Sequence, residues 1–127
     1  MSEKSIAEKL LIKDNYRVLL INAPDSYRTL LGELPANVDI LRESAGPVDL
    51  IQVFVTSMKE AEERLPQLKS VLKPKGLLWV TYPKGTSRFR TDVNRDIIRS
   101  FSATIGMQVV VMISIDDTWS AMRLKIE

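Results

Sequence analysis

The sequence contains neither cysteine nor histidine, and these two absences exclude several classes of function. Without cysteine the chain has no disulfide bond, no thiolate metal ligand and no cysteine nucleophile. Without histidine it lacks the commonest general base, the commonest zinc ligand and the central member of a Ser-His-Asp triad. The sequence therefore predicts no metal site, and it offers no familiar pairing of a nucleophile with its base.

Long apolar runs and a strong charge of one sign are also missing. No stretch of about 18 consecutive apolar residues occurs, so no transmembrane helix is predicted, and residues 1–15 lack the apolar segment of a signal peptide. The net charge is only +2, from 18 basic and 16 acidic residues. So small an excess of positive charge attracts nucleic acid weakly. From these absences together, we expect a cytoplasmic protein that binds neither nucleic acid nor a membrane.

The order of the apolar segments is typical of an α/β domain. Short, nearly continuous apolar runs, as in buried parallel strands, alternate with segments in which apolar residues recur every three or four positions, as in helices. The runs lie at 16–23, 38–42, 49–55 and 77–82, and the helical segments at 5–12, 25–34, 57–72 and 91–105. Two last runs, at 108–115 and 119–126, are separated by three residues and predict an antiparallel hairpin.

Several residues mark the ends of the predicted helices. Asp25 is expected to cap the second helix, and an S-x-x-E pattern beginning at Ser57 predicts a capping box on the third. The fourth helix is expected to start at Thr91 or Asp92, with Asp92 as a candidate cap, and to end at Gly106.

Strands that alternate with helices require a parallel sheet with right-handed crossovers and helices on both faces. The sequence therefore predicts a single three-layer, Rossmann-like α/β domain over residues 1–127. Its sheet has about six strands, mostly parallel, and ends in the antiparallel hairpin. Residues 1–14 form a helical lead-in.

Residues 72–80 read L-K-P-K-G followed directly by an apolar strand, with a turn expected at 73–76. This segment resembles the one before the fifth strand of class I S-adenosylmethionine methyltransferases. In that superfamily a helix and a strand follow, and a last strand inserts antiparallel. By element order the resemblance covers residues 16–126, with one strand–helix pair missing between Arg42 and Asp49.

The chain is also similar to a bacterial family of small domains of unknown function. The stretches that carry this similarity are 22–24 (NAP), 72–84 (LKPKGLLWVTYPK), 91–96 (TDVNRD) and 116–123 (DDTWSAMR). This resemblance supplies no activity.

Methyltransferases of this class bind their cofactor in a glycine-rich loop after the first strand, where backbone must approach the ligand closely. Here that loop contains Asn22 and Pro24 but no glycine before Gly32, and Pro24 has no amide to donate. The loop therefore argues against S-adenosylmethionine. Glu43, at the end of the second strand, has the spacing of a carboxylate that grips a ribose; the alternative is a solvated loop acid.

The loop after the fourth strand combines Tyr82 with the basic residues Lys84, Arg88 and Arg90. Open α/β sheets bind ligands at the carboxyl ends of their strands, and arginine binds phosphate or carboxylate through two parallel hydrogen bonds. This loop is therefore the best candidate for an anion site, and the alternative is a solvated loop.

Two functional hypotheses follow. The missing glycine loop favours a non-catalytic methyltransferase-like domain that binds a protein partner or forms a homodimer, since an open sheet leaves unpaired edges. The alternative is a domain that binds a small anionic or nucleotide-like ligand, including an S-adenosylmethionine-dependent enzyme. The candidate ligand-binding residues are Asn22, Pro24, Glu43, Tyr82, Lys84, Arg88 and Arg90.

Overall fold

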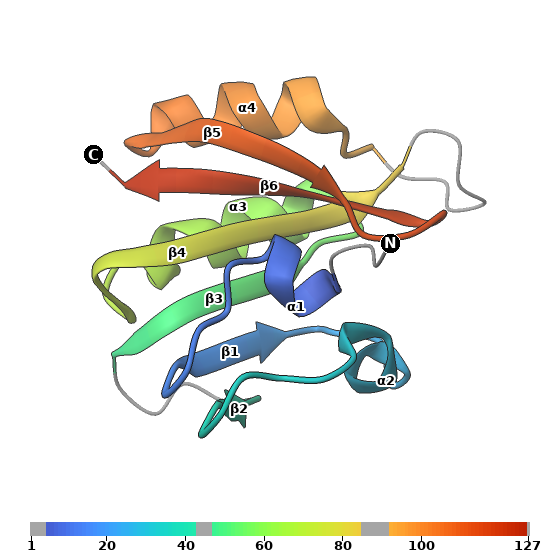
Figure 1. Ribbon diagram of the computed structural model, residues 1–127. Coiled ribbons are helices and arrows are strands. Elements are labelled where there is room, and N and C mark those ends of the chain that lie inside the picture. The colour runs from blue at the N-terminus through green and yellow to red at the C-terminus, as the bar shows by residue number, and fades with distance from the viewer. Residues whose placement is uncertain (1–4, 43–46, 85–91, 127) are drawn as a thin grey trace.

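The computed structural model describes residues 5–42, 47–84 and 92–126, in which six strands form one sheet (Figure 1). The helices are α1 (Ile6–Lys9), α2 (Tyr27–Leu31), α3 (Met58–Leu68) and α4 (Arg95–Thr104). The strands are β1 (Arg17–Ile21), β2 (Asp39–Leu41), β3 (Val48–Phe54), β4 (Leu72–Pro83), β5 (Met107–Ser114) and β6 (Trp119–Ile126).

The strand order is β2-β1-β3-β4-β6-β5. The first four of these strands are parallel, and β6 runs antiparallel between β4 and β5. The predicted mostly parallel sheet with its antiparallel end pair is therefore confirmed. The insertion of β6 between β4 and β5 also agrees with the strand arrangement that the methyltransferase resemblance implies.

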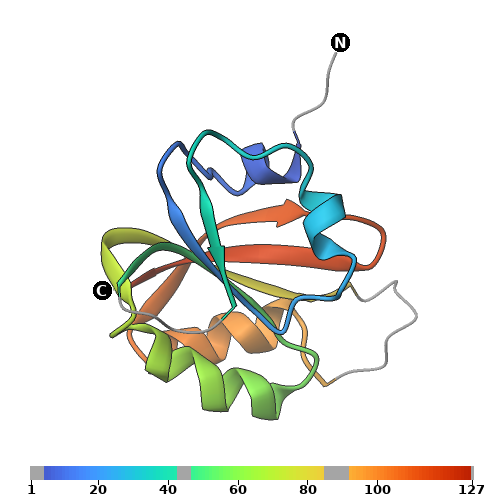
Figure 2. The same cartoon turned by 90° about the horizontal axis from the view of Figure 1, so that it is seen from below.

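Helices cover both faces of the sheet, α1 and α2 on one side and α3 and α4 on the other (Figure 2). Neighbouring residues of a strand point to opposite faces, so each face has its own buried cluster. Leu19 and Leu78 belong to the cluster under α3 and α4, whereas Leu20 and Trp79 belong to the cluster under α1 and α2. No helix in the described ranges is long and apolar enough to cross a membrane.

The L-K-P-K-G segment forms part of a strand, so the expected turn at 73–76 is wrong. Val48 pairs with Leu72 and Leu50 pairs with Leu77, which leaves extra residues on β4 as a bulge. Lys75 has a φ of 67° within this bulge. Because the extra residues of a bulge do not donate to the ladder, the bulge accommodates the proline that a regular inner strand excludes.

Two predicted helix caps are also wrong. Asp25 does not cap α2, which begins after Ser26 without a side-chain cap; the amide of Tyr27 instead donates to the carbonyl of Pro24 at 2.9 Å. Asp92 does not cap α4. Asn94 does so, accepting from the amide of Ile97 at 3.0 Å.

The carboxylate of Asp92 instead accepts a hydrogen bond from the amide of Met58 at 2.8 Å. Met58 is the first residue of α3, so an acid that precedes α4 in sequence caps a different helix. This contact ties the start of α3 to the segment that leads into α4. Gly106, with a φ of 76°, follows α4 as predicted.

A chain of buried hydrogen bonds joins α2 to the two central strands. The hydroxyl of Tyr27 donates to Gln52 Oε1 at 2.7 Å, and Gln52 Nε2 donates to Thr81 Oγ1 at 2.9 Å. Gln52 and Thr81 are fully buried, and burial raises the pKa of Tyr27 despite its bond to Gln52. Because a buried amide without partners is costly, this chain fixes α2 on the sheet.

Replacing Tyr27 by phenylalanine should therefore destabilise the protein. The variant Tyr27→Phe leaves Gln52 Oε1 buried without its donor, at an expected cost of about 1–3 kcal/mol in the free energy of unfolding. Urea denaturation of both proteins measures this difference. Tyr16→Phe, at a half-buried tyrosine, is the matched control and should change stability by less than about 0.5 kcal/mol. Equal effects of the two changes would contradict the assignment.

Candidate functional site

The carboxyl ends of β1, β3 and β4 lie at one edge of the sheet, because parallel strands end on the same side (Figure 1). From this edge β1 leads to α2 on one face, and β3 leads to α3 on the other. The connections thus diverge between β1 and β3. In open α/β sheets this divergence creates the crevice in which ligands bind.

A hydrogen bond spans this crevice. Asn22, directly after β1, has a φ of 60°, a left-handed conformation that asparagine tolerates better than most residues. Its Nδ2 donates to Glu60 Oε2, in the first turn of α3, at 2.9 Å. Glu60 Oε1 accepts from the amide of Thr56 at 3.0 Å and from its hydroxyl at 2.6 Å. The side chain of Glu60 therefore links the end of β1 to the segment after β3.

These contacts change the acidity of Glu60. Partial burial raises its pKa, but the hydrogen bonds from Thr56 and the charge of Arg64 together outweigh burial and hold the pKa below its ordinary value of 4.5. The sequence predicted Glu60 only as one half of a capping box. Ser57 does accept from the amide of Glu60 at 3.2 Å, as that pattern requires. The contact with Asn22 depends on tertiary structure, which the sequence pattern does not contain.

Two features of the described residues at this crevice oppose the binding of S-adenosylmethionine. The turn after β1 has no glycine, and Asn22 directs its side chain across the crevice to Glu60. The carbonyl of Pro24 is already bonded to the amide of Tyr27. The Asn22–Glu60 bond lies where this fold class binds its ligands. Glu43, the candidate ribose ligand, lies outside the described residues.

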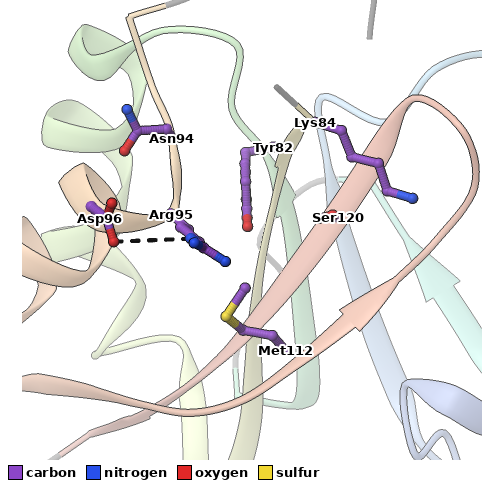
Figure 3. A pocket seen from close by; sticks show the side chains of 7 residues that line it. All are labelled: Tyr82, Lys84, Asn94, Arg95, Asp96, Met112 and Ser120. Carbon is purple, nitrogen blue, oxygen red and sulfur yellow. Dashed lines mark ion pairs between the residues drawn. The ribbon is translucent and has the colours of Figure 1, made fainter. Parts of the chain in front are cut away.

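A separate cavity lies at the carboxyl end of β4, and we call it the β4 cavity. Its volume is about 500 Å³. It is lined by Tyr82, Lys84, Asn94, Arg95, Asp96, Met112 and Ser120, which come from β4, the start of α4, β5 and β6 (Figure 3). Tyr82 lies between helix α4 and the β5–β6 hairpin. The guanidinium of Arg95 points toward the same space as the ring of Tyr82 (Figure 3).

The β4 cavity is lined by two cations and one acid among the described residues. Lys84 Nζ donates to the hydroxyl of Ser114 at 2.6 Å, so its partner there is neutral. Arg95 and Asp96 form a long, exposed ion pair, with 4.0 Å between Nε and Oδ1. The amide of Lys84 donates to the carbonyl of Thr118 at 2.7 Å, which fixes the lysine backbone against the hairpin turn.

Tyr82 supplies a neutral hydroxyl to this cavity. Burial raises its pKa, although the charge of Arg95 and a hydrogen bond with Ser120 act in the opposite direction. The phenol therefore stays protonated at neutral pH and can donate a hydrogen bond to an anion. The described residues contain no group of three or more acids that could hold a metal ion.

The structure brings two of the seven candidate residues together. Tyr82 and Lys84 line the β4 cavity, whereas Asn22 and Pro24 lie at the end of β1. Glu43, Arg88 and Arg90 lie outside the described residues, so their role remains a prediction. The sequence interpretation did not identify Arg95 as a cavity residue, because its orientation depends on how α4 packs against the hairpin.

The contacts of Glu60 predict a pH dependence of stability. Because the folded state lowers this pKa, the unfolded chain binds the proton more readily. The stabilisation is therefore present above pH 4.5 and is lost as the pH falls through the lower pKa of the folded protein. Glu60→Gln should flatten this part of the curve of unfolding free energy against pH, whereas Glu62→Gln, at an exposed acid of the same helix, should not. Parallel curves for wild type and Glu60→Gln would contradict the assignment.

No protein-family model and no curated protein sequence matches the chain. Solved structures with a similar fold include SAM-dependent methyltransferases. One is a TehB-like SAM-dependent methyltransferase from Corynebacterium glutamicum, with 11% identity and a TM-score of 0.63 over 95% of this chain and 85% of that chain. A SAM-dependent methyltransferase from Aquifex aeolicus has 17% identity and a TM-score of 0.57 over 93% and 88%. DhpI in complex with SAH has 12% identity and a TM-score of 0.60 over 94% and 82%.

At such low identities the likeness concerns the fold alone. It agrees with the element order and with the resemblance carried by the L-K-P-K-G segment. Membership of the small bacterial family stays a prediction. The chain has a methyltransferase-like, Rossmann-like α/β fold.

Proposed function

We propose that this methyltransferase-like domain binds a small anionic or nucleotide-like ligand in the β4 cavity. The observation that carries the proposal is that Lys84 and Arg95 border one cavity at the ligand-binding end of an α/β sheet. This is the second of the two hypotheses from the sequence. The ligand would lie in the β4 cavity and not in the crevice after β1.

The chemistry of the lining residues favours a phosphate or carboxylate group. Arg95 presents a planar fork that can bind two oxygens of such a group, and Lys84 adds a mobile point charge. Tyr82 offers a neutral hydroxyl from the cavity wall, and Met112 offers apolar contact to the rest of a ligand. Asp96 reduces the net positive charge, so a singly or doubly charged ligand fits better than a polyanion.

A ligand screen with matched variants tests this proposal. Inorganic phosphate, pyrophosphate, AMP and ATP are added to the full chain, and the melting temperature is recorded. A ligand at a hundredfold excess over its dissociation constant stabilises the folded state by roughly 2.7 kcal/mol. For the ligand that gives the largest shift, Arg95→Ala and Lys84→Ala should each weaken binding about tenfold, or about 1.4 kcal/mol.

Arg28→Ala is the control because it removes the same charge from an exposed arginine of α2, on the opposite face of the sheet. Its affinity should equal that of the wild type. If no anion in the screen shifts the melting temperature, or if Arg28→Ala has the same effect as Arg95→Ala, the proposed site is wrong. The non-catalytic, protein-binding role that the sequence favours would then be the stronger proposal.

Methyl transfer from S-adenosylmethionine is the second candidate function. It is supported by the comparisons, in which DhpI is bound to SAH and several other proteins are SAM-dependent methyltransferases. It is opposed by the Asn22–Glu60 hydrogen bond, which spans the crevice where this fold class binds its ligands. The two candidates therefore place a ligand at different parts of the same sheet edge.

Asn22→Gly separates these candidates. Glycine adopts the left-handed conformation of residue 22 without strain and removes the side chain that spans the crevice. If S-adenosylmethionine binds there, isothermal titration should show tighter binding to Asn22→Gly than to wild type, and Lys84→Ala should leave this affinity unchanged. No detectable binding to either protein would exclude the second candidate.

A further inference from the structure

The outer edge of β5 is an unpaired strand edge that carries neither charge nor proline. β5 is the last strand in the sheet order, so no strand of the described ranges pairs with its outer side. Its eight residues, MQVVVMIS, include no charge and no proline, although charges and prolines are common means of blocking an edge. The opposite edge, β2, has only three residues. The two edges of this sheet therefore differ greatly in their capacity to pair.

Apolar side chains are exposed along the same edge. Val110, Val111 and Met112 are 41%, 39% and 40% exposed, and they are consecutive residues of β5. The pairing register with β6 shifts between Val109 and Val111, so Val110 is the extra residue of a bulge. The pairing of β5 is regular on either side of this bulge. The longer regular part, residues 111–114, remains available for pairing at its outer edge.

Helix α4 provides a positive wall beside this edge. Arg95 and Arg99 are four residues apart and therefore lie on the same side of the helix. Arg95 lines the β4 cavity together with Met112 of β5. Arg99 lines a second hollow of about 470 Å³ together with Ala103 of α4 and with Met107, Gln108 and Val109 of β5. Among the described residues that line the two hollows, Asp96 is the single acid.

We infer that the outer edge of β5 binds an extended segment of a partner protein that carries acidic side chains at alternate positions. In this kind of recognition, backbone hydrogen bonds to the edge supply affinity and alternate side chains supply specificity. Alternate residues of the added strand face α4, because successive side chains of a strand point to opposite faces.

The spacing of the two arginines matches such a segment. Residues four apart in a helix are separated by about 6 Å along its axis, at roughly 1.5 Å per residue. Residues two apart in a strand are separated by about 6.6 Å, at roughly 3.3 Å per residue. Acidic residues at two successive α4-facing positions of the added strand therefore come level with Arg95 and Arg99, while its apolar residues cover Val111 on the other face.

Charge favours an acidic partner over a second copy of this chain. Two copies joined by antiparallel pairing of β5 with β5 would form a continuous sheet, with the two α4 helices on the same face. With pairing centred on residues 111–114, Arg95, which lines the β4 cavity with Met112, would approach Arg95 of the other copy. An acidic segment neutralises the same charges.

Selection from a displayed library of random eight-residue peptides tests the inference. The library is selected against the immobilised full chain and, in parallel, against Arg99→Glu. The wild type should enrich peptides with Asp or Glu at alternate positions, and Arg99→Glu should bind these peptides at least about tenfold more weakly. Hydrogen exchange should show new protection of β5 amides in the wild-type complex.

Matched variants separate the edge from other surfaces. Val111→Lys places a charge on the edge and should abolish peptide binding, whereas Leu30→Lys, at a residue of α2 with 40% exposure, should not. Lys84→Ala should retain peptide binding, which distinguishes this surface from the ligand site proposed above. Circular dichroism and the melting temperature establish that each variant is folded.

Four results would overturn the inference. The first three are no enriched peptide, enrichment of basic or uncharged peptides alone, and binding that Val111→Lys leaves intact. The fourth would come from light scattering. A dimer of the wild type that Val111→Lys dissociates would show that a second copy of the chain, and not an acidic segment, occupies this edge.

Discussion

The side-chain amide of Gln52 sets a constraint on the whole central part of this fold. It is fully buried, and its two hydrogen bonds go to Tyr27 of α2 and Thr81 of β4. Its polar atoms are satisfied only when α2, β3 and β4 are all in place, and a partly satisfied network is costly in a medium of low dielectric constant. Helix α2 has only five residues, too few to be stable alone. Its position therefore depends on this network and on the burial of Tyr27 and Leu31.

The two halves of the carboxyl edge differ because one half satisfies its polar groups internally. Glu60 binds Thr56 and Asn22 between β1 and β3, and Asp92 caps the start of α3 nearby. These contacts use carboxylates and amides that a ligand would otherwise meet. At the end of β4, within the described residues, Lys84 contacts a neutral hydroxyl and Arg95 forms a long, exposed ion pair. Positive charge without a close acidic partner among these residues therefore lies beside β4, away from the crevice where this fold class binds its ligands.

Much of the fold was predictable from sequence, because buried strands and amphipathic helices leave periodic patterns. The apolar runs predicted the strands to within two residues, except that β4 begins five residues earlier than expected, and the three-residue spacing before Trp119 predicted the hairpin. Asp25 and Asp92 were assigned wrongly because a cap was assumed to serve the next helix in sequence, whereas Asp92 caps α3 across a tertiary contact. Tyr82 and Lys84 were proposed as ligand residues from their position at the end of a strand, and both line the β4 cavity. Arg95 was missed because only the packing of α4 turns it toward the same cavity.

The position of β6 in the sheet has a consequence for synthesis of the chain. β6 follows β5 in sequence but lies between β4 and β5. As the nascent chain leaves the ribosome, β4 and β5 emerge before the strand that separates them, and both present unpaired inner edges until residues 119–126 are free. An early β4–β5 pairing would be a kinetic trap, since it must open to admit β6. The inner edges of β4 and β5 are therefore exposed to chaperones or aggregation during that interval, and β6 covers them once folding is complete.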